Sequence, residues 1–266
     1  MGLVCHSLHS RTILPVHRIF RLLAKMKYLI WDFSETLGYR EGGGWSAVML
    51  EILLQEIPDC GVRTEQLSPF LQEGFLWHQP ERPHPELSKP DAWWDSLDPV
   101  FTRAFAMGIG LDESTAHRLA RMVRQVCPER SAWRLYEDTL PVLVHLSSEG
   151  WIHIALTNHI PELPAIFDHL GLSPHLAALF NSAQTGYEKP HPQAFRQVLS
   201  WVSEPEAIWM IGDNYTADIL GAERQGIPGI LVRKTDPRAD YCCADLSGVV
   251  KIVSHYAEAF ASWTLE

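Results

Sequence analysis

Three polar side chains able to take part in catalysis each follow an apolar run in this sequence of 266 residues. They are Asp32, Thr157 and Asp213, and the runs that precede them cover residues 28–31, 152–156 and 208–211. Each run is typical of a buried parallel strand. Because the carboxyl ends of parallel strands form the ligand site of an open sheet, we expect the three side chains to converge.

Two converging carboxylates repel each other unless a cation lies between them. Magnesium accepts oxygen ligands from one or two carboxylates and keeps several waters, so it suits such a site. Lys189, in the stretch "GYEKPHP", adds an ammonium group. With Asp32 as nucleophile, Mg²⁺ and Lys189 as charge neutralisers, and Thr157 with nearby backbone amides as phosphate cradle, the set predicts phosphoryl transfer.

Each of these residues alone has an ordinary explanation. An aspartate at a strand end is more often a turn or cap residue, and Thr157-Asn158 is a good helix start. Asp213 and Asp218 could be turn and helix-start acids. Their order along the chain is far more specific than any one of them.

The elements that must position these residues alternate between strand and helix. Helical patterns are expected at 138–148, 161–170, 192–202 and 216–224, and further short strands at 229–232 and 249–253. Such alternation predicts an α/β fold, a Rossmann-like doubly wound parallel sheet covered on both faces.

One long interval breaks the alternation. Residues 39–134 contain helical patterns at 45–56, 93–107 and 113–126 but no convincing strand, and "HQPERPHPELSKP" should be an irregular connection. We interpret 39–134 as a helical cap inserted into an α/β core of residues 27–38 and 135–266. Gly42, Gly43 and Gly44 could form its hinge or simply a flexible loop.

Composition limits the partners. The net charge of −10 argues against nucleic acid, and no apolar run is long enough to cross a bilayer. Five cysteines without CxxC spacing suit a reducing compartment. We therefore expect a cytoplasmic protein without nucleic-acid or membrane partners. From the predicted phosphoryl-transfer site we expect a small phosphorylated substrate, and we expect a monomer or homodimer.

The first residues differ from the rest of the chain. Residues 1–31 hold five Lys or Arg and no acid. This could be an organelle-targeting segment, but we favour a poorly ordered basic extension over residues 1–26, with Met26 as the natural start.

Several longer motifs identify a family. The stretches "WDFSETL", "IALTN", "GYEKPHPQAF" and "MIGDNYTADILGAERQGIPGILV" resemble the haloacid dehalogenase (HAD) superfamily, and "WRLYEDTLPVLVHLSSEGW" resembles the passage from cap to core in its branch with a helical cap after the first strand. The resemblance runs from Lys27 to the C-terminus. It implies that Asp32 forms an aspartyl-phosphate.

The resemblance also implies roles for the other site residues. Magnesium would be held by Asp32, Asp213 and the backbone carbonyl of Ser34, while Asp218 would orient a metal-bound water or Lys189. Thr157 and the amide of Asn158 would bind the transferring phosphoryl group, and Lys189 would neutralise it.

Ser34 departs from the family pattern. Phosphatases of the family carry there a second aspartate that protonates the leaving oxygen, and Glu35 replaces the usual glycine that follows. A hydroxyl cannot do that work near neutral pH, and losing a general acid typically costs about 10²–10⁴ in rate. Metal and phosphate binding need not suffer.

Several readings follow from Ser34. A phosphatase could act on a substrate with a good leaving group, such as an acyl phosphate or an activated aryl ester. Alternatively, Glu35, the substrate itself, His78 or His84 could supply the proton. For the two histidines the simpler reading is that they are exposed loop residues without a role. A dehalogenase needs no acid, but Asp213 and Asp218 argue against it. A phosphonate hydrolase would need Lys89, which has the setting of a solvated loop, and a phosphomutase would need the missing acid. The alternative from another class is a HAD-like binding protein without turnover.

Overall fold

The computed structural model describes residues 26–203 and 205–263. The expected extension of residues 1–26 therefore lies outside the described residues except for Met26, and so does Cys5. Within the described part of the chain, no helix combines the length and apolar character needed to cross a membrane.

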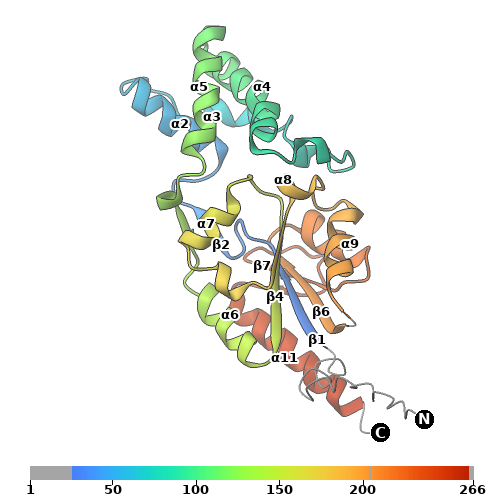
Figure 1. Cartoon of the computed structure of the whole chain (residues 1–266). Coiled ribbons are helices and arrows are strands. Elements are labelled where there is room, and N and C mark those ends of the chain that lie inside the picture. Colours follow the sequence, from blue (N-terminus) through green and yellow to red (C-terminus); the bar gives the residue numbers. More distant parts are fainter. Residues whose placement is uncertain (1–25, 204, 264–266) are drawn as a thin grey trace, which may run out of the picture.

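A six-stranded parallel sheet forms the centre of the molecule (Figure 1). Its strands run in the order β5-β4-β1-β6-β7-β8, with bounds β1 Met26–Trp31, β4 Trp151–Thr157, β5 Ala178–Asn181, β6 Pro205–Gly212, β7 Gly229–Val232 and β8 Cys242–Cys243. The chain winds outward from β1 on one side and then returns to β6 on its other side. This order confirms the α/β, Rossmann-like doubly wound fold.

Alternate residues of β1 face the two layers of helices. Leu29 and Trp31 belong to the larger apolar core, while Tyr28 and Ile30 belong to a smaller one on the opposite face. The larger core takes buried side chains from α6 Thr139–Ser148, α7 Leu163–His169 and α11 Leu246–Trp263, and the smaller from α9 Pro192–Trp201 and α10 Gly221–Glu223. A strand buried on both faces needs the continuous apolar run that the sequence has here.

A helical segment, residues 41–132, lies between two short strands. These strands, β2 Gly38–Arg40 and β3 Trp133–Leu135, pair antiparallel at its base. The segment contains α2 Trp45–Glu56, α3 Thr64–Leu67, α4 Pro90–Ile109 and α5 Glu113–Val126, with 3₁₀ turns η1 Ser68–Leu71, η2 Leu76–His78, η3 Pro85–Leu87 and η4 Arg130–Ala132. Its apolar interior is continuous with the larger core of the sheet.

The proline-rich stretch of the helical segment is the irregular connection that the sequence predicts, with turns and bends around η3. The expectation of no strand in the interval is wrong at its borders, where β2 and β3 pair. Each has three residues, too few for a period-two pattern to stand out.

The strand expected at 249–253 is also wrong, because these residues lie in α11. Leu246, Val249 and Val253 are buried there, a spacing of three and four that fits one face of a helix. A stretch of only five residues, here Val and Ile around Lys251, is compatible with a strand and with a buried helix, and only a longer periodic pattern separates the two. The sequence reading also missed β5, β8, η5 Ser173–His175 and α8 Ser182–Thr185.

Candidate active site

Asp32 lies at the carboxyl end of the central strand and is 7 % exposed. Its backbone N–H donates to the carbonyl of Ile211 on β6 at 2.9 Å, which continues the sheet ladder past the end of β1. On the other neighbour, β4, the hydroxyl of Thr157 donates to Asp32 Oδ1 at 2.9 Å. Both adjacent strands therefore fix the position of this carboxylate.

Lys189 connects two of the carboxylates. Its Nζ donates to Asp32 Oδ1 at 2.7 Å and to Asp218 Oδ1 at 2.6 Å, and its side chain is almost wholly buried. Burial alone would lower the pKa of Lys189, but the ion pairs with Asp218 and Asp32 outweigh it and hold that pKa above its usual value. The lysine is therefore charged throughout the physiological range.

Asn158 holds the backbone of Lys189. Its Nδ2 donates to the Lys189 carbonyl at 2.9 Å, and its Oδ1 accepts from the Lys189 N–H at 2.7 Å. Residue 158 follows directly after β4, so this pair of hydrogen bonds ties the loop that carries Lys189 (the lysine loop) to the end of that strand.

Asp218 lies within a π-helix, η6 Tyr215–Leu220, that follows β6. Asn214 caps this helix by accepting from the backbone N–H groups of Thr216 and Ala217, both at 3.0 Å. The N–H of Asn214 in turn donates to Asp218 Oδ2 at 3.0 Å. The turn after β6 thus directs the buried carboxylate of Asp218 back toward β1.

Asp213 completes an acidic cluster. One carboxylate oxygen from each of Asp32, Asp213 and Asp218 lies within 4.8 Å of the other two. Burial and the charge of Asp32 raise the pKa of Asp213, while Lys234, whose Nζ lies 2.5 Å from Asp213 Oδ2, opposes the shift. Burial also raises the pKa of Asp218. The cluster presents the all-oxygen donor set that Mg²⁺ prefers, and its buried negative charge favours a cation.

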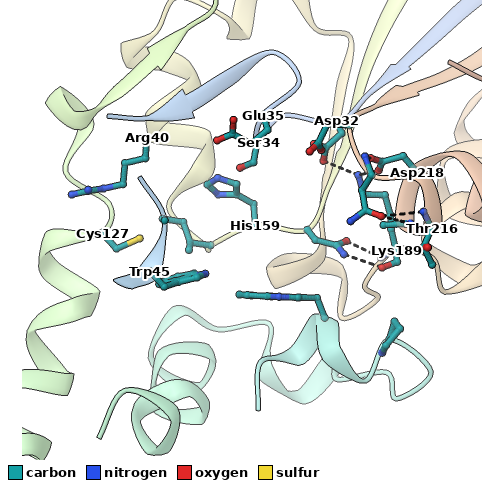
Figure 2. Close-up of a pocket in the computed structure, with 18 of the residues that line it drawn as sticks. Asp32, Ser34, Glu35, Arg40, Trp45, Cys127, His159, Lys189, Thr216 and Asp218 are labelled. Atoms are coloured by element: carbon teal, nitrogen blue, oxygen red, sulfur yellow. Dashed lines mark hydrogen bonds and ion pairs between the residues drawn. The ribbon is translucent and has the colours of Figure 1, made fainter. Parts of the chain in front are cut away.

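A cavity of about 520 Å³ opens over this cluster (Figure 2). It is lined by most of the site residues that the sequence predicts: Asp32, Ser34, Asn158, Lys189, Asp213 and Asp218. Thr157 does not line the cavity but donates a hydrogen bond to Asp32, which does. The structure therefore brings all seven residues together from four separate stretches of the chain.

Ser34 and Glu35 lie side by side at this cavity (Figure 2). Glu35 has a positive φ of 59°, a conformation that glycine adopts more readily. Its Oε2 accepts from the hydroxyl of Tyr136 at 2.9 Å. Residues 34 and 35 are thus available to a substrate, although neither carries the aspartate side chain of the family pattern.

The two candidate histidines of the helical segment lie away from this cavity lining. His78 is exposed beside the rings of Phe75 and Trp77, as the simpler reading expects. For His84 that reading is wrong, because the residue is 4 % exposed and its Nε2 lies 3.1 Å from Oε1 of the buried Glu188. A loop rich in proline gives no sequence signal for such burial, which depends on a partner 104 residues away.

The His84 contact joins the helical segment to the lysine loop. The N–H of His84 donates to the carbonyl of Gly186 at 2.8 Å, and a Cβ at Gly186 would lie 2.5 Å from backbone atoms of Pro85. Glu188 directly precedes Lys189 in the chain. The segment around η3 therefore packs on the loop that carries the catalytic candidate Lys189.

The tryptophans that the sequence suggests for an entrance divide into two pairs. Trp45 and Trp77 line the cavity, whereas Trp93 and Trp94 are buried in the apolar core. Lys89 is exposed at the start of α4 and lies away from the cavity lining. A Schiff-base role for Lys89 has no support from this placement.

Sequence reasoning missed several residues of the site. Lys234 lies two positions beyond β7, so the rule that strand ends form the site could have found it. His159 follows the Thr157-Asn158 pair and could have been found in the same way. Arg40, Cys127 and Trp133 also line the cavity. Arg40 and Trp133 are paired residues of β2 and β3, for which the sequence gives little signal, and Cys127 directly follows α5.

Comparison with known proteins agrees with this geometry. The family model of haloacid dehalogenase-like hydrolases matches residues 84–226, more than half of the chain. The chain belongs to this family of hydrolases. The matched region includes Thr157, Lys189, Asp213 and Asp218.

Individual relatives are distant. The chain is 28% identical over 161 residues to phosphoserine phosphatase of Thermus thermophilus, covering 58% of this chain and 64% of that protein. It is 30% identical over 101 residues to glyceraldehyde 3-phosphate phosphatase of Methanothermobacter thermautotrophicus, covering 37% and 45%. The chain thus spans less than two thirds of the length of these curated relatives.

Among solved structures, the magnesium-bound YfnB of Bacillus subtilis superimposes with a TM-score of 0.60 at 16% identity, covering 87% of this chain and 100% of that chain. At this identity the likeness concerns the fold alone.

Proposed function

We propose that this hydrolase is a magnesium-dependent phosphatase that acts on a small phosphorylated metabolite through an aspartyl-phosphate at Asp32. One observation carries the proposal: Lys189 bridges Asp32 and Asp218 in a buried cluster that Asp213 joins, at the end of the central strand. The two phosphatases among the relatives support it as well.

In the proposed reaction, a carboxylate oxygen of Asp32 attacks phosphorus. Lys189 donates to the carboxylate of Asp32 and offers its positive charge to the transferring phosphoryl group. Thr157 and the amide of Asn158 orient that group. Asp32, Asp213, Asp218 and the carbonyl of Ser34 would hold Mg²⁺, which neutralises phosphate charge when bound.

In this scheme Ser34 occupies the position at which the family pattern has its general acid and base, and its hydroxyl cannot do that work. The proposed enzyme therefore depends on leaving groups that depart without a proton. Residues 39–134 would act as its cap over a core of 27–38 and 135–266, with Gly42 and Gly43, both at positive φ, as the hinge. A cytoplasmic location and a monomeric or homodimeric state remain predictions from the sequence.

The test is hydrolysis of para-nitrophenyl phosphate and acetyl phosphate, with and without Mg²⁺, by the wild type and by Asp32→Asn. We expect turnover that requires Mg²⁺ and is lost in the variant. Activity of Asp32→Asn near the wild-type level would remove Asp32 as nucleophile. Intact Mg²⁺ binding without turnover on either substrate would favour the second candidate, a binding protein, for which the missing acid at position 34 is the specific argument.

A further inference from the structure

The cavity has two chemically different walls. The core wall carries Asp32, Lys189, Asp213 and Asp218. The helical wall, which faces it, is formed by Trp45, Val48, Trp77 and Pro80 of the helical segment. The lining also includes polar residues such as Arg40 and Thr216, but a substrate with its phosphate on the core wall meets apolar and aromatic side chains on the helical wall.

The rings of the helical wall form a fixed stack. Trp45 lies 5.9 Å from Trp77 at an interplanar angle of 19° and 5.4 Å from Phe75 at 27°, and Phe75 lies 4.5 Å from Trp77 at 11°. Phe75 is buried and packs on both tryptophans, which are themselves partly exposed. Parallel rings held from behind lose little conformational freedom when a further ring packs on them.

His159 extends this apolar character toward the nucleophile. It is 6 % exposed, and its ring lies 5.4 Å from that of Phe33 and 5.0 Å from that of Trp133. In Figure 2 it lies between Ser34 and the Trp45 ring. Burial lowers the pKa of His159 to about 4, against the opposing effect of Asp32. The imidazole is therefore neutral near pH 7 and supplies no acid in place of the one that Ser34 lacks.

Apart from Lys189, Arg40 is the one Lys or Arg among the described residues that line the cavity, and it is already paired. The guanidinium of Arg40 donates to Glu51 Oε2 at 2.8 Å and to the carbonyl of Val126 at 3.3 Å. Arg40 Nε has no hydrogen-bond partner in the part of the chain that the structure describes, but the charge of the guanidinium is balanced by Glu51. The side of the cavity away from the acidic cluster thus offers a carboxylate on the leaving group only a cation that is already ion-paired, and it suits an uncharged leaving group better than a zwitterionic one such as that of phosphoserine.

We infer that the site takes aryl phosphates, monoesters whose leaving group is an uncharged aromatic alcohol, with the ring packed against Trp45 and Trp77. This inference rests on the proposed phosphatase function and names its substrate class. It explains together the apolar helical wall and the missing acid at position 34.

The chemistry of the step agrees with this class. A carboxylate oxygen of Asp32 bonds to phosphorus while the bond from phosphorus to the aryl oxygen breaks, and the aryl oxide leaves with the electron pair. A phenol has a pKa of about 10, as in tyrosine, so its anion departs without a proton and takes one from solvent. Water then attacks the aspartyl-phosphate, which releases the Asp32 carboxylate and inorganic phosphate, and the proton of that water passes to solvent.

The first test is binding, which does not depend on turnover. Phenylphosphonate and methylphosphonate, which the proposed reaction cannot hydrolyse, are titrated into the wild-type protein with Mg²⁺ in a calorimeter. We expect phenylphosphonate to bind about tenfold more tightly, because a buried ring contact is worth on the order of one factor of ten. Equal affinities would overturn the aryl inference whether or not the protein turns over any substrate.

The second test is specificity. The ratio of kcat/KM for phenyl phosphate to that for acetyl phosphate should fall about tenfold in Trp45→Leu or Trp77→Leu, mainly through KM for the aryl substrate. Trp201→Leu, a change at an exposed tryptophan on α9, is the matched control and should keep the wild-type ratio. Both Trp45→Leu and Trp77→Leu are made in case one of them does not fold. An unchanged ratio of kcat/KM values in a variant that folds would overturn the inference. Failure of the phosphatase proposal would appear separately, as Mg²⁺-independent or absent turnover on both substrates.

Discussion

The core wall of the cavity and the helical segment that forms the opposite wall differ in where their ion pairs lie. The ion pairs of Lys189 with Asp32 and Asp218 are buried, whereas the helical segment keeps pairs such as Arg118–Glu56 and Arg124–Asp91 at its surface. Buried charges at the core wall cost free energy in the folded state and are suited to chemistry. The helical wall instead has an interior of packed rings, which suits substrate selection.

This contrast is tested most strongly by removing the buried cation. Lys189→Met should abolish turnover and lower the free energy of unfolding by about 3–5 kcal/mol, because it leaves carboxylates buried without a partner. Arg118→Met, which breaks an exposed pair of 2.6 Å, should cost less than about 1 kcal/mol. Chemical denaturation of both variants measures the difference.

Magnesium provides a second arm of that experiment. If Mg²⁺ binds the cluster, it should raise the midpoint of unfolding of Lys189→Met more than that of Arg118→Met. Equal losses of stability in the two variants would contradict the contrast between the walls.

The next prediction restores the missing acid. Ser34→Asp should raise kcat on alkyl phosphates by about 10²–10⁴, since their leaving groups need a proton. Phenyl phosphate should gain much less, and steady-state kinetics on both substrates separate the two cases. Ser34→Asn, which has a similar shape and no acid, is the control. If alkyl phosphates stay unreactive, the missing acid does not limit the rate.

A third prediction concerns acid stability of the core. The indole N–H of Trp31 donates to His153 Nδ1 at 3.0 Å, so a proton on that nitrogen would face another donor. Burial lowers the pKa of His153 to about 4. The unfolded chain, with an ordinary pKa of about 6.5, then binds more protons between pH 6.5 and 4, and stability falls as the pH drops through this window.

The expected loss is about 2 kcal/mol between pH 7 and pH 5 from His153 alone. Urea denaturation at both pH values measures it, and the loss should shrink in His153→Gln. The exposed His145 is the matched site, and His145→Gln should keep the full dependence on pH. An unchanged dependence in His153→Gln would assign the effect to other groups.

The smallest effect concerns the place where the two regions meet. His84→Gln should reduce kcat/KM by about tenfold, because Glu188 would lose its close partner and the neighbouring Lys189 loop would shift slightly. The same change at the exposed His78 should have no effect. If His84→Gln retains the wild-type kcat/KM, the docking of the helical segment on this loop does not position Lys189.

Much of the core wall follows from the sequence. The apolar runs before Asp32, Thr157 and Asp213 are long enough to predict strands, and their ends must meet in any parallel sheet. The 3.6-residue period also predicts α2 and α5 with the bounds that the structure has. Val249 to Val253 is the counterexample, since four apolar residues interrupted by Lys251 carry no decisive period.

The sequence by itself determined the α/β order and the position of Asp32, Thr157 and Asp213 at strand ends, because these are local properties of residue type and spacing. Only the tertiary structure decided that His84 is buried on Glu188 and that Trp45 and Trp77, rather than Trp93 and Trp94, line the cavity with Asp32 and Lys189. Each of these joins residues distant in the chain, and such contacts depend on how whole elements pack rather than on any pattern within one of them.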